Sequence, residues 1–264
     1  MEQQQQLAFL LEFLLAELPQ YRPWAVQQLQ AGKSRRFVIR GLMNLRPPLP
    51  LQPDFLQVQD QMLTQERLQK GVVDAAALPV CARNPRLSLW QGDITRLQAD
   101  AIVNAANSAL LGCFSPCHTC IDNAIHSAAG LQLRQACYQL MTAQGQPEAT
   151  GQVKVTKGYN LPARYVFHTV GPVVEGRLGQ RQRQELASCY QSCLQGAVDY
   201  GLKTIAFCCI STGVFGFPRQ PAAEIALATV ENFLQQDVSL RKVIFNVFGD
   251  EDAALYRALL GPDR

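Results

Sequence analysis

Three cysteines and one histidine lie close together in the segment Gly-Cys-Phe-Ser-Pro-Cys-His-Thr-Cys, residues 112–120. Thiolate sulfur and imidazole nitrogen are the donors that zinc prefers, and three protein ligands leave a fourth position open for catalysis. We take Cys113, His118 and Cys120 as the ligand set. Cys117 is the alternative fourth ligand, although it and its neighbour His118 would then have to point the same way. Chance clustering without a metal is the alternative to zinc binding.

Asp122 lies two residues after Cys120, at the start of a segment in which apolar side chains recur at helical spacing. A carboxylate in this place can orient a metal ligand, accept a proton from an attacking water, or favour the positive end of the helix dipole. His126 follows one helical turn later. We interpret it as a hydrogen-bonding partner of Asp122 rather than as a further ligand.

Two short polar motifs offer hydrogen-bonding groups suited to a base or a sugar. Asp93 and Ile94 lie in a Gly-Asp-Ile-Thr motif after a predicted strand, where a carboxylate can accept from an exocyclic amine or a ribose. Asp also caps helices routinely, which is the alternative. Asn104 and Asn107, separated by two alanines, can bind sugar hydroxyls. Asparagine is equally favoured in polar turns without a ligand.

A glycine-bearing loop lies between an apolar strand and a helix that begins near Pro218. Glycines let backbone amides converge on an anion, and the dipole of the following helix adds to the attraction, so the loop could hold a diphosphate. It lacks the lysine of a P-loop and the spacing of a dinucleotide fingerprint, and a glycine turn without a ligand is the alternative. Its residues are Ser211, Thr212, Gly213, Val214, Phe215, Gly216 and Phe217.

These motifs belong to a region whose apolar runs predict βα units around a mixed sheet, an α/β fold. We predict strands at residues 87–90, 101–103, 152–157, 165–170, 204–210 and 242–247, and helices at about 120–143, 181–200, 218–236 and 250–260. Ligands bind beyond the carboxyl ends of strands in open α/β sheets. The loops after these strands are therefore where chemistry is expected.

Residues 1–82 consist of helix-like stretches instead of short apolar runs, and they predict a helical N-terminal extension to a domain at 83–264. Prolines interrupt its helix-like stretches, because proline lacks the amide donor that a helix interior needs. One clear helix is expected at 54–70, closed by Gly71. It carries no cluster of candidate ligands, so packing or substrate gating is the only role that we assign.

The charge and cysteine content exclude several classes of protein. A net charge of +3, from 24 basic and 21 acidic residues, leaves no large field of one sign for duplex nucleic acid. Nine unevenly spaced cysteines favour free thiols or metal ligands in a reducing compartment over a disulfide framework. The apolar stretch near the N-terminus is interrupted by Glu12 and Glu17, unlike a signal peptide or a membrane span. We expect a cytoplasmic protein that binds neither nucleic acid nor membranes.

Four segments, taken together and in order, resemble the macrodomain family, whose members bind ADP-ribose in a cleft above a mixed sheet. They are residues 91–94, 101–107, 165–172 and 210–218, and the resemblance covers about residues 87–262. The family's usual glycine-rich stretch after the second segment is replaced here by the cysteine and histidine cluster. This replacement and the N-terminal extension are similar to the zinc-dependent macrodomain branch found in microbes, in which position 117 is not a ligand.

The resemblance implies a three-layer α/β/α macrodomain and a role for each motif. Asp93, with Ile94 in the same motif, would bind the adenine amine, and Phe248 could lie against the adenine. Asn104 and Asn107 would contact the distal ribose. Residues 211–217 would wrap the diphosphate. Asp122 matches an acidic residue that related hydrolases place near the reactive carbon, so it is a catalytic candidate together with Asn107.

We therefore predict a zinc-dependent hydrolase that removes mono-ADP-ribose from modified proteins, with an acidic side-chain ester as the linkage that the resemblance implies. Zinc would polarise a ribose hydroxyl or a water near the anomeric carbon, while Asp122 and Asn107 position the reacting groups. A non-catalytic ADP-ribose reader with a structural zinc is the main alternative. A zinc-stabilised interaction module without affinity for ADP-ribose is a third.

Overall fold

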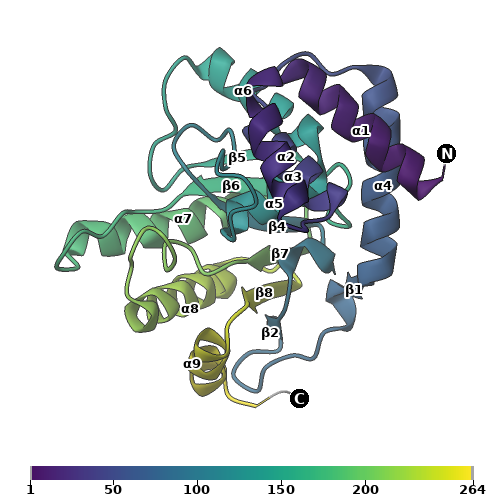
Figure 1. Ribbon diagram of the computed structural model, residues 1–264. Helices are drawn as coiled ribbons and strands as arrows, with labels where there is room; N and C mark the ends of the chain where they lie inside the picture. Colours follow the sequence, from purple (N-terminus) through teal and green to yellow (C-terminus); the bar gives the residue numbers. More distant parts are fainter. Residues whose placement is uncertain (1, 263–264) are drawn as a thin grey trace.

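The computed structural model of this chain describes residues 2–262. Residues 1 and 263–264, the outermost positions of the two predicted regions, lie outside the described residues. The chain begins with α1 (Gln3–Glu17), a short 3-10 turn (Pro19–Tyr21), α2 (Arg22–Gln30), α3 (Arg35–Leu45) and α4 (Pro53–Lys70). These helices, purple to blue in Figure 1, confirm the predicted helical N-terminal region.

Local sequence explains where the two helices nearest the rest of the protein begin and end. The Ser34 side chain accepts a hydrogen bond from the Phe37 amide and so caps α3. Pro53 begins α4, where its missing amide costs nothing, and Gly71 ends it with a φ of 76°. The helix predicted at 54–70 is therefore confirmed.

The centre of the protein is a six-stranded mixed sheet in the order β2-β8-β7-β4-β6-β5. All neighbouring strands are parallel except β5 and β6, which are antiparallel. The strands are β2 (Leu87–Gln91), β4 (Ala101–Ala106), β5 (Val153–Lys157), β6 (Tyr165–Val170), β7 (Thr204–Phe207) and β8 (Lys242–Val247). Two very short strands, β1 (Val73–Asp74) and β3 (Leu97–Gln98), pair separately. Strand β8 is buried at every position, and its residues 243–245 form the apolar run expected of a strand covered on both faces.

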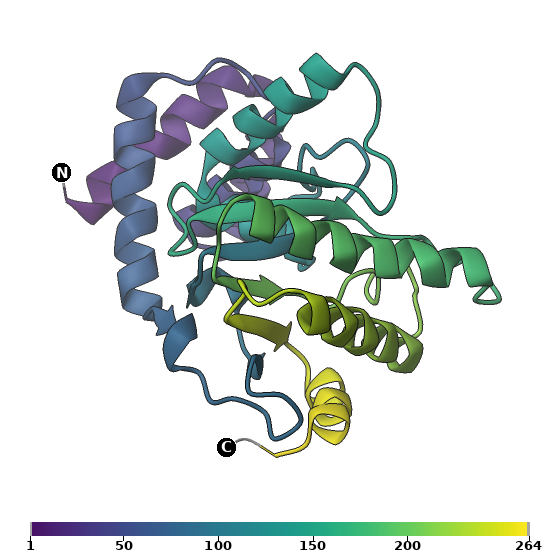
Figure 2. The same cartoon turned by 180° about the vertical axis from the view of Figure 1, so that it is seen from behind.

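Helices cover both faces of this sheet, which gives the expected three layers (Figures 1 and 2). On one side lie α5 (Ile121–Ala129) and α6 (Leu131–Gln144), with the N-terminal helices stacked beyond them. On the other lie α7 (Gln180–Asp199) and α8 (Arg219–Gln236), with α9 (Asp250–Leu260) beside β2 and β8. No helix among residues 2–262 is long and apolar enough to cross a membrane.

Three predicted elements differ from the structure. The helix expected at 120–143 is two helices, because Gly130 has a φ of 93° and a side chain there would meet Gln59, Gln132 and Asn160. The strand expected at 101–103 continues to Ala106, so Asn104 lies inside a strand and not in the loop after it. The strand expected at 204–210 ends at Phe207, because its pairing with β4 ends at Ala206 and its pairing with β8 ends at Phe207.

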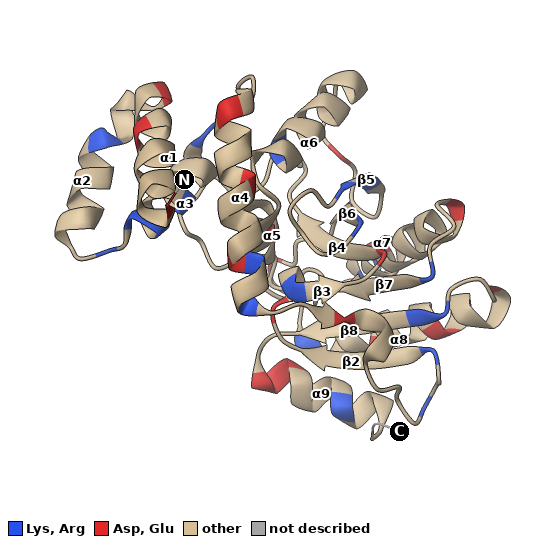
Figure 3. Ribbon diagram, turned by 90° about the vertical axis from the view of Figure 1, so that its right-hand side faces the viewer, with Lys and Arg blue, Asp and Glu red and all other residues tan. Residues whose placement is uncertain are grey.

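The N-terminal helices have an apolar core of their own. Leu10, Leu14, Ile39 and Leu42 are fully buried in it, and Leu131 is its only buried member from the rest of the described chain. The larger core surrounds the sheet and already includes Ala75 and Cys81. The larger core thus begins before residue 83, where we placed the second domain. In the view of Figure 3, basic and acidic positions are interspersed over both regions, in keeping with the small net charge.

Candidate functional site

A cleft of about 680 Å³ lies where β4, β7 and β8 end. Three loops supply most of its wall: the segment between β4 and α5, the segment after β7, and the segment between β8 and α9. Because parallel strands bring their carboxyl ends to one edge, motifs far apart in sequence meet here. Its lining residues from the predicted site are Asn107, Cys113, His118, Cys120, Asp122, Ser211, Thr212, Gly213, Val214 and Phe215.

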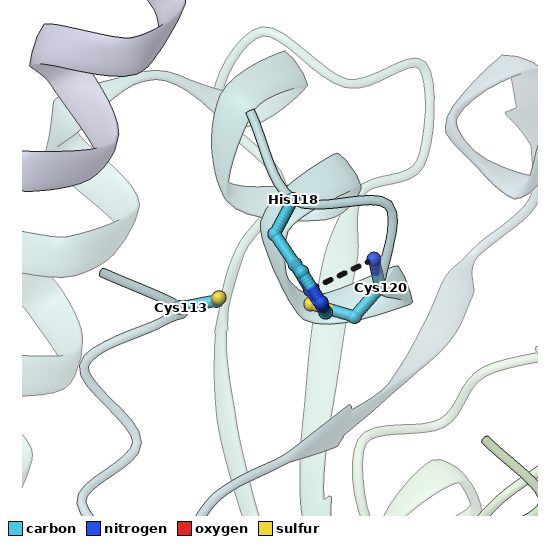
Figure 4. A group of neighbouring side chains, drawn as sticks. All are labelled: Cys113, His118 and Cys120. Atoms are coloured by element: carbon cyan, nitrogen blue, oxygen red, sulfur yellow. Dashed lines mark hydrogen bonds between the residues drawn. The ribbon is translucent and has the colours of Figure 1, made fainter. Parts of the chain in front are cut away.

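Cys113, His118 and Cys120 form one group at the wall of this cleft (Figure 4). One donor atom from each lies within 4.8 Å of the others, and all three residues are half-buried. The Cys120 amide donates a hydrogen bond to His118 Nδ1 at 3.3 Å, which holds the imidazole beside the Cys120 thiol. Burial, with the neighbouring Cys113 sulfur adding to it, raises the pKa of the Cys120 thiol to about 11. A divalent cation would reverse this effect, because it stabilises thiolates.

Cys117 is not part of this group. Its thiol donates to the Phe37 carbonyl oxygen at 3.4 Å, on helix α3, and its backbone has a φ of 56°. This left-handed conformation turns the side chain of Cys117 away while its neighbour His118 joins the group. The structure thus brings together the three residues that we took as ligands.

Asp122 occupies the first turn of α5 with only 5% of its surface exposed, yet it lines the cleft. Asn104 Nδ2 donates to its Oδ1 at 2.8 Å, and Asn107 Nδ2 lies 3.4 Å from its Oδ2. Burial raises the pKa of Asp122 to about 6, although the Asn104 hydrogen bond and the charge of Arg134 oppose the rise. The carboxylate is therefore a stronger base than an exposed aspartate, and it stays largely ionised at neutral pH.

The two asparagines have different places. Asn107 lines the cleft and also donates to the Gly112 carbonyl oxygen at 3.1 Å. Asn104 is fully buried in β4, outside the cleft lining, with its amide between Asp122 and His168 Nδ1. A direct contact of Asn104 with the distal ribose stays a prediction that these positions do not test.

Two buried histidines stand behind Asp122. The ring nitrogens of His168 both have partners inside the sheet, because Nε2 lies 2.9 Å from Thr156 Oγ1 and Nδ1 lies 3.2 Å from Asn104 Nδ2. His126 Nε2 lies 3.5 Å from Asp122 Oδ1, too far for a good hydrogen bond. Burial lowers the pKa of His126 well below its ordinary value, so it is neutral at physiological pH.

The glycine-bearing loop forms the opposite wall. Among residues 2–262, no protein group accepts a hydrogen bond from the amides of Gly213, Val214 or Phe215. Gly216 and Phe217 do not line the cleft. Phe217 is instead buried in the core, and its amide donates to the Ser211 carbonyl oxygen at 3.0 Å, which closes the loop.

Asp93 and Ile94 lie away from the cleft lining. Asp93 Oδ1 accepts from the Thr95 amide at 3.0 Å and from its hydroxyl at 2.6 Å, so Asp93 caps a 3-10 turn at Ile94–Arg96. Ile94 is buried in the core. The capping alternative therefore describes the local structure, and adenine binding by these residues remains a prediction.

Three residues at the far end of the cleft complete its wall. Phe248 is 80% exposed and offers a free aromatic face, as the resemblance implies. Sequence reasoning missed Asn246 and Asp252. The signal for Asn246 was a polar residue near the end of a mostly apolar strand. Cys208 and Cys209 also line the cleft because β7 ends before them.

The fold and the site together define a macrodomain. The Macro domain family matches residues 103–226. The macrodomain of Trypanosoma brucei, solved in complex with ADP-ribose, superimposes with a TM-score of 0.66 at 34% identity, covering 84% of this chain and 95% of that one. The chain therefore belongs to the macrodomain family.

Relatives of known activity indicate which kind of macrodomain this chain is. A protein-ADP-ribose hydrolase of Treponema medium is 49% identical over 98% of this chain and 100% of its own length. A protein-ADP-ribose hydrolase of Staphylococcus aureus is 50% identical over 85% of this chain and 84% of its own length. By this similarity the chain is an enzyme, and the N-terminal helices fall within the part shared with the first relative.

Proposed function

We propose that this enzyme hydrolyses the bond between ADP-ribose and a protein, using zinc held by Cys113, His118 and Cys120. The observation that carries the proposal is that Asp122, a buried carboxylate with a raised pKa, shares one cleft with these three donors. Perturbed titratable groups beside an incomplete ligand set are typical of catalytic rather than structural sites.

The three donors fit zinc by type and by spacing. Two sulfurs and one imidazole nitrogen within 4.8 Å of one another can converge on one ion, and soft thiolates favour zinc over magnesium or calcium. When bound, zinc would supply Lewis acidity at this wall of the cleft. The half-buried donors face the cleft, so a substrate can approach them.

Asp122 and Asn107 perform the part of the reaction that falls to the protein. Asp122 is ionised at neutral pH, so it can accept a proton from the attacking water. The buried Asn104 amide fixes one of its oxygens, which leaves the other directed toward Asn107. Because Asn107 also holds the Gly112 carbonyl oxygen, it links the carboxylate to the backbone just before Cys113.

The rest of the cleft suits ADP-ribose. The free amides of Gly213, Val214 and Phe215 can donate to a diphosphate, and the α8 helix dipole nearby adds attraction for an anion. The exposed ring of Phe248 can stack on adenine. With the diphosphate at these amides and the adenine at Phe248, the distal ribose would lie beside Asp122 and the proposed metal ligands, as bond cleavage at its anomeric carbon requires.

We propose acidic side chains as the linkage and the cytoplasm as the location. A glutamate or aspartate ester yields free ADP-ribose and a protein carboxylate when water adds across the bond. Nine unevenly spaced cysteines fit a reducing compartment better than a disulfide framework. A matched panel of one protein mono-ADP-ribosylated on acidic, arginine or serine side chains tests the linkage. We expect release from the acidic sample alone, and equal release from all three would contradict this specificity.

The reader alternative makes a different prediction for the same panel. A reader binds ADP-ribose with no release from any sample, whereas a structural zinc module binds no ADP-ribose at all. The position of Asp122 favours the hydrolase, because a reader gains nothing from burying a carboxylate beside the ribose site.

A further inference from the structure

Helix α3 of the N-terminal region contacts the loop that carries the three proposed metal ligands. Asn44 Oδ1 accepts from the Cys117 amide at 2.9 Å. Arg40 Nη2 donates to the His118 carbonyl oxygen at 3.3 Å and to Asn123 Oδ1 at 2.9 Å. Cys117 directly precedes the proposed ligand His118, and Asn123 lies in α5, which begins immediately after Cys120.

These polar contacts are part-buried and are linked to one another. Asn44 is only 2% exposed, and its Nδ2 donates to Ser127 Oγ at 3.0 Å, so both ends of its amide are used. Asn123 Nδ2 donates in turn to the Ser115 carbonyl oxygen at 3.0 Å, within the same loop. A buried amide is tolerated only when its partners are in place, so Asn44 strongly favours one loop conformation.

The end of α3 is tied to the start of the loop as well. Arg134 of α6 donates to the carbonyl oxygens of Met43 and Asn44, at 2.9 and 2.8 Å, and to that of Leu111 at 2.7 Å. Leu111 lies two residues before Cys113. The Arg134 guanidinium thus binds the last carbonyl oxygens of α3 and, at the same time, the carbonyl oxygen of Leu111 at the start of the loop.

The separation of the two apolar cores explains why the hydrogen bonds between α3 and the loop determine the position of the loop. The N-terminal helices fill a core of their own, and Leu131 is its only buried residue from beyond them among residues 2–262. Arg40 and Asn44 contact the loop through hydrogen bonds. Hydrogen bonds are directional, whereas apolar packing tolerates small shifts.

We propose that α3, through Arg40 and Asn44, positions Cys113, His118 and Cys120 for zinc, which gives the N-terminal helices a role in the catalytic site. This inference rests on the proposed zinc site. Arg40 and Asn44 are positioning residues, since they contact the loop backbone and its neighbours and not the cleft. Their loss leaves all three donors present but loosens the arrangement that converges them.

The full-length protein and three substitutions test the inference. Arg40→Met and Asn44→Ala remove the contacts with the loop. Arg36→Met is the matched control, because Arg36 lies one turn earlier on α3 and pairs with Glu66 of α4 instead of with the loop. The zinc dissociation constant is measured by competition with a chromophoric chelator, and the Tm of each protein is measured after metal removal.

Partners of metal ligands typically contribute 10- to 100-fold to metal affinity, so we expect Arg40→Met and Asn44→Ala to weaken zinc binding about tenfold or more, with Arg36→Met close to wild type. Wild-type zinc affinity in both test variants, even with a lowered Tm, would show that Arg40 and Asn44 only help α3 to pack. This result would overturn the inference and leave the proposed zinc site standing. A wild-type protein that takes up no zinc would overturn the proposed metal site and this inference with it.

Discussion

Asn104 donates a hydrogen bond to Asp122 at 2.8 Å from within strand β4, where no part of Asn104 reaches the surface. The amide therefore acts on the carboxylate from behind the cleft. Replacing it by alanine removes this bond and leaves Asp122 free to turn. We expect Asn104→Ala to lower kcat about tenfold or more, as loss of an orienting partner does. Steady-state kinetics check this, and a change confined to KM would point to direct ribose contact instead.

Asp122 is predicted to matter for turnover more than for binding. A positioned acid–base group contributes roughly 10²- to 10⁴-fold, so Asp122→Ala should reduce the release rate by about 100-fold or more. The variant should still bind ADP-ribose, because the loop at residues 211–215 and Phe248 are untouched. Calorimetric titration alongside the rate assay separates the two effects. Full turnover without the carboxylate would remove Asp122 from the mechanism.

Phe248 gives a prediction for affinity without a change in stability. Its side chain is 80% exposed, so it contributes little to the core. Stacking of a base on an aromatic ring contributes about 1–3 kcal/mol by alanine substitution, so Phe248→Ala should weaken ADP-ribose binding about fivefold to 150-fold. Phe248→Tyr, which keeps the ring, serves as the control and should bind normally. Unaltered affinity of the alanine variant would place adenine elsewhere.

Asp100 makes the stability of the sheet depend on pH. Burial opposes ionisation, but hydrogen bonds from the amides of Lys203 and Thr204 and from Arg164 outweigh it and lower the pKa of Asp100. A pKa lowered in the folded state stabilises the fold above the unfolded value of about 3.9, and this contribution is lost as pH falls through the folded value.

Asp100→Ala should therefore lower the free energy of unfolding by about 1–3 kcal/mol at neutral pH. Urea unfolding of the wild type and the variant, compared near pH 7 and near pH 3, checks this. We expect the difference between them to shrink in acid. A difference that does not change with pH would mean that the ionised form contributes nothing.

Much of the fold could be predicted from the sequence, because apolar runs and glycine-bearing loops mark each strand and its end. Patterns alone do not show how far a strand pairs, so Asn104 was placed in a loop although it pairs with His168 inside the sheet. Gly130 sits in a good helical pattern, and only its contacts with Gln59 and Asn160 explain the break there.

The grouping of Cys113, His118 and Cys120 was predictable because these residues are close in sequence and of distinctive type. Asn246 and Asp252 were not, since Asn246 lies in a mostly apolar strand and Asp252 belongs to an acidic first helical turn, and neither pattern is distinctive. The contact between Asn44 and Cys117 joins residues 73 positions apart. Nothing local in α3 signals such a partner, because the contact exists only once two separate cores have packed.

The most direct test of the central claim is release of ADP-ribose from a protein mono-ADP-ribosylated on acidic side chains. Intact enzyme is compared with zinc-stripped enzyme, with enzyme reloaded with zinc, and with Cys113→Ser, which weakens one ligand. We predict release by the intact and reloaded enzyme, and little by the stripped enzyme and the variant. Full release by zinc-stripped enzyme would contradict the account.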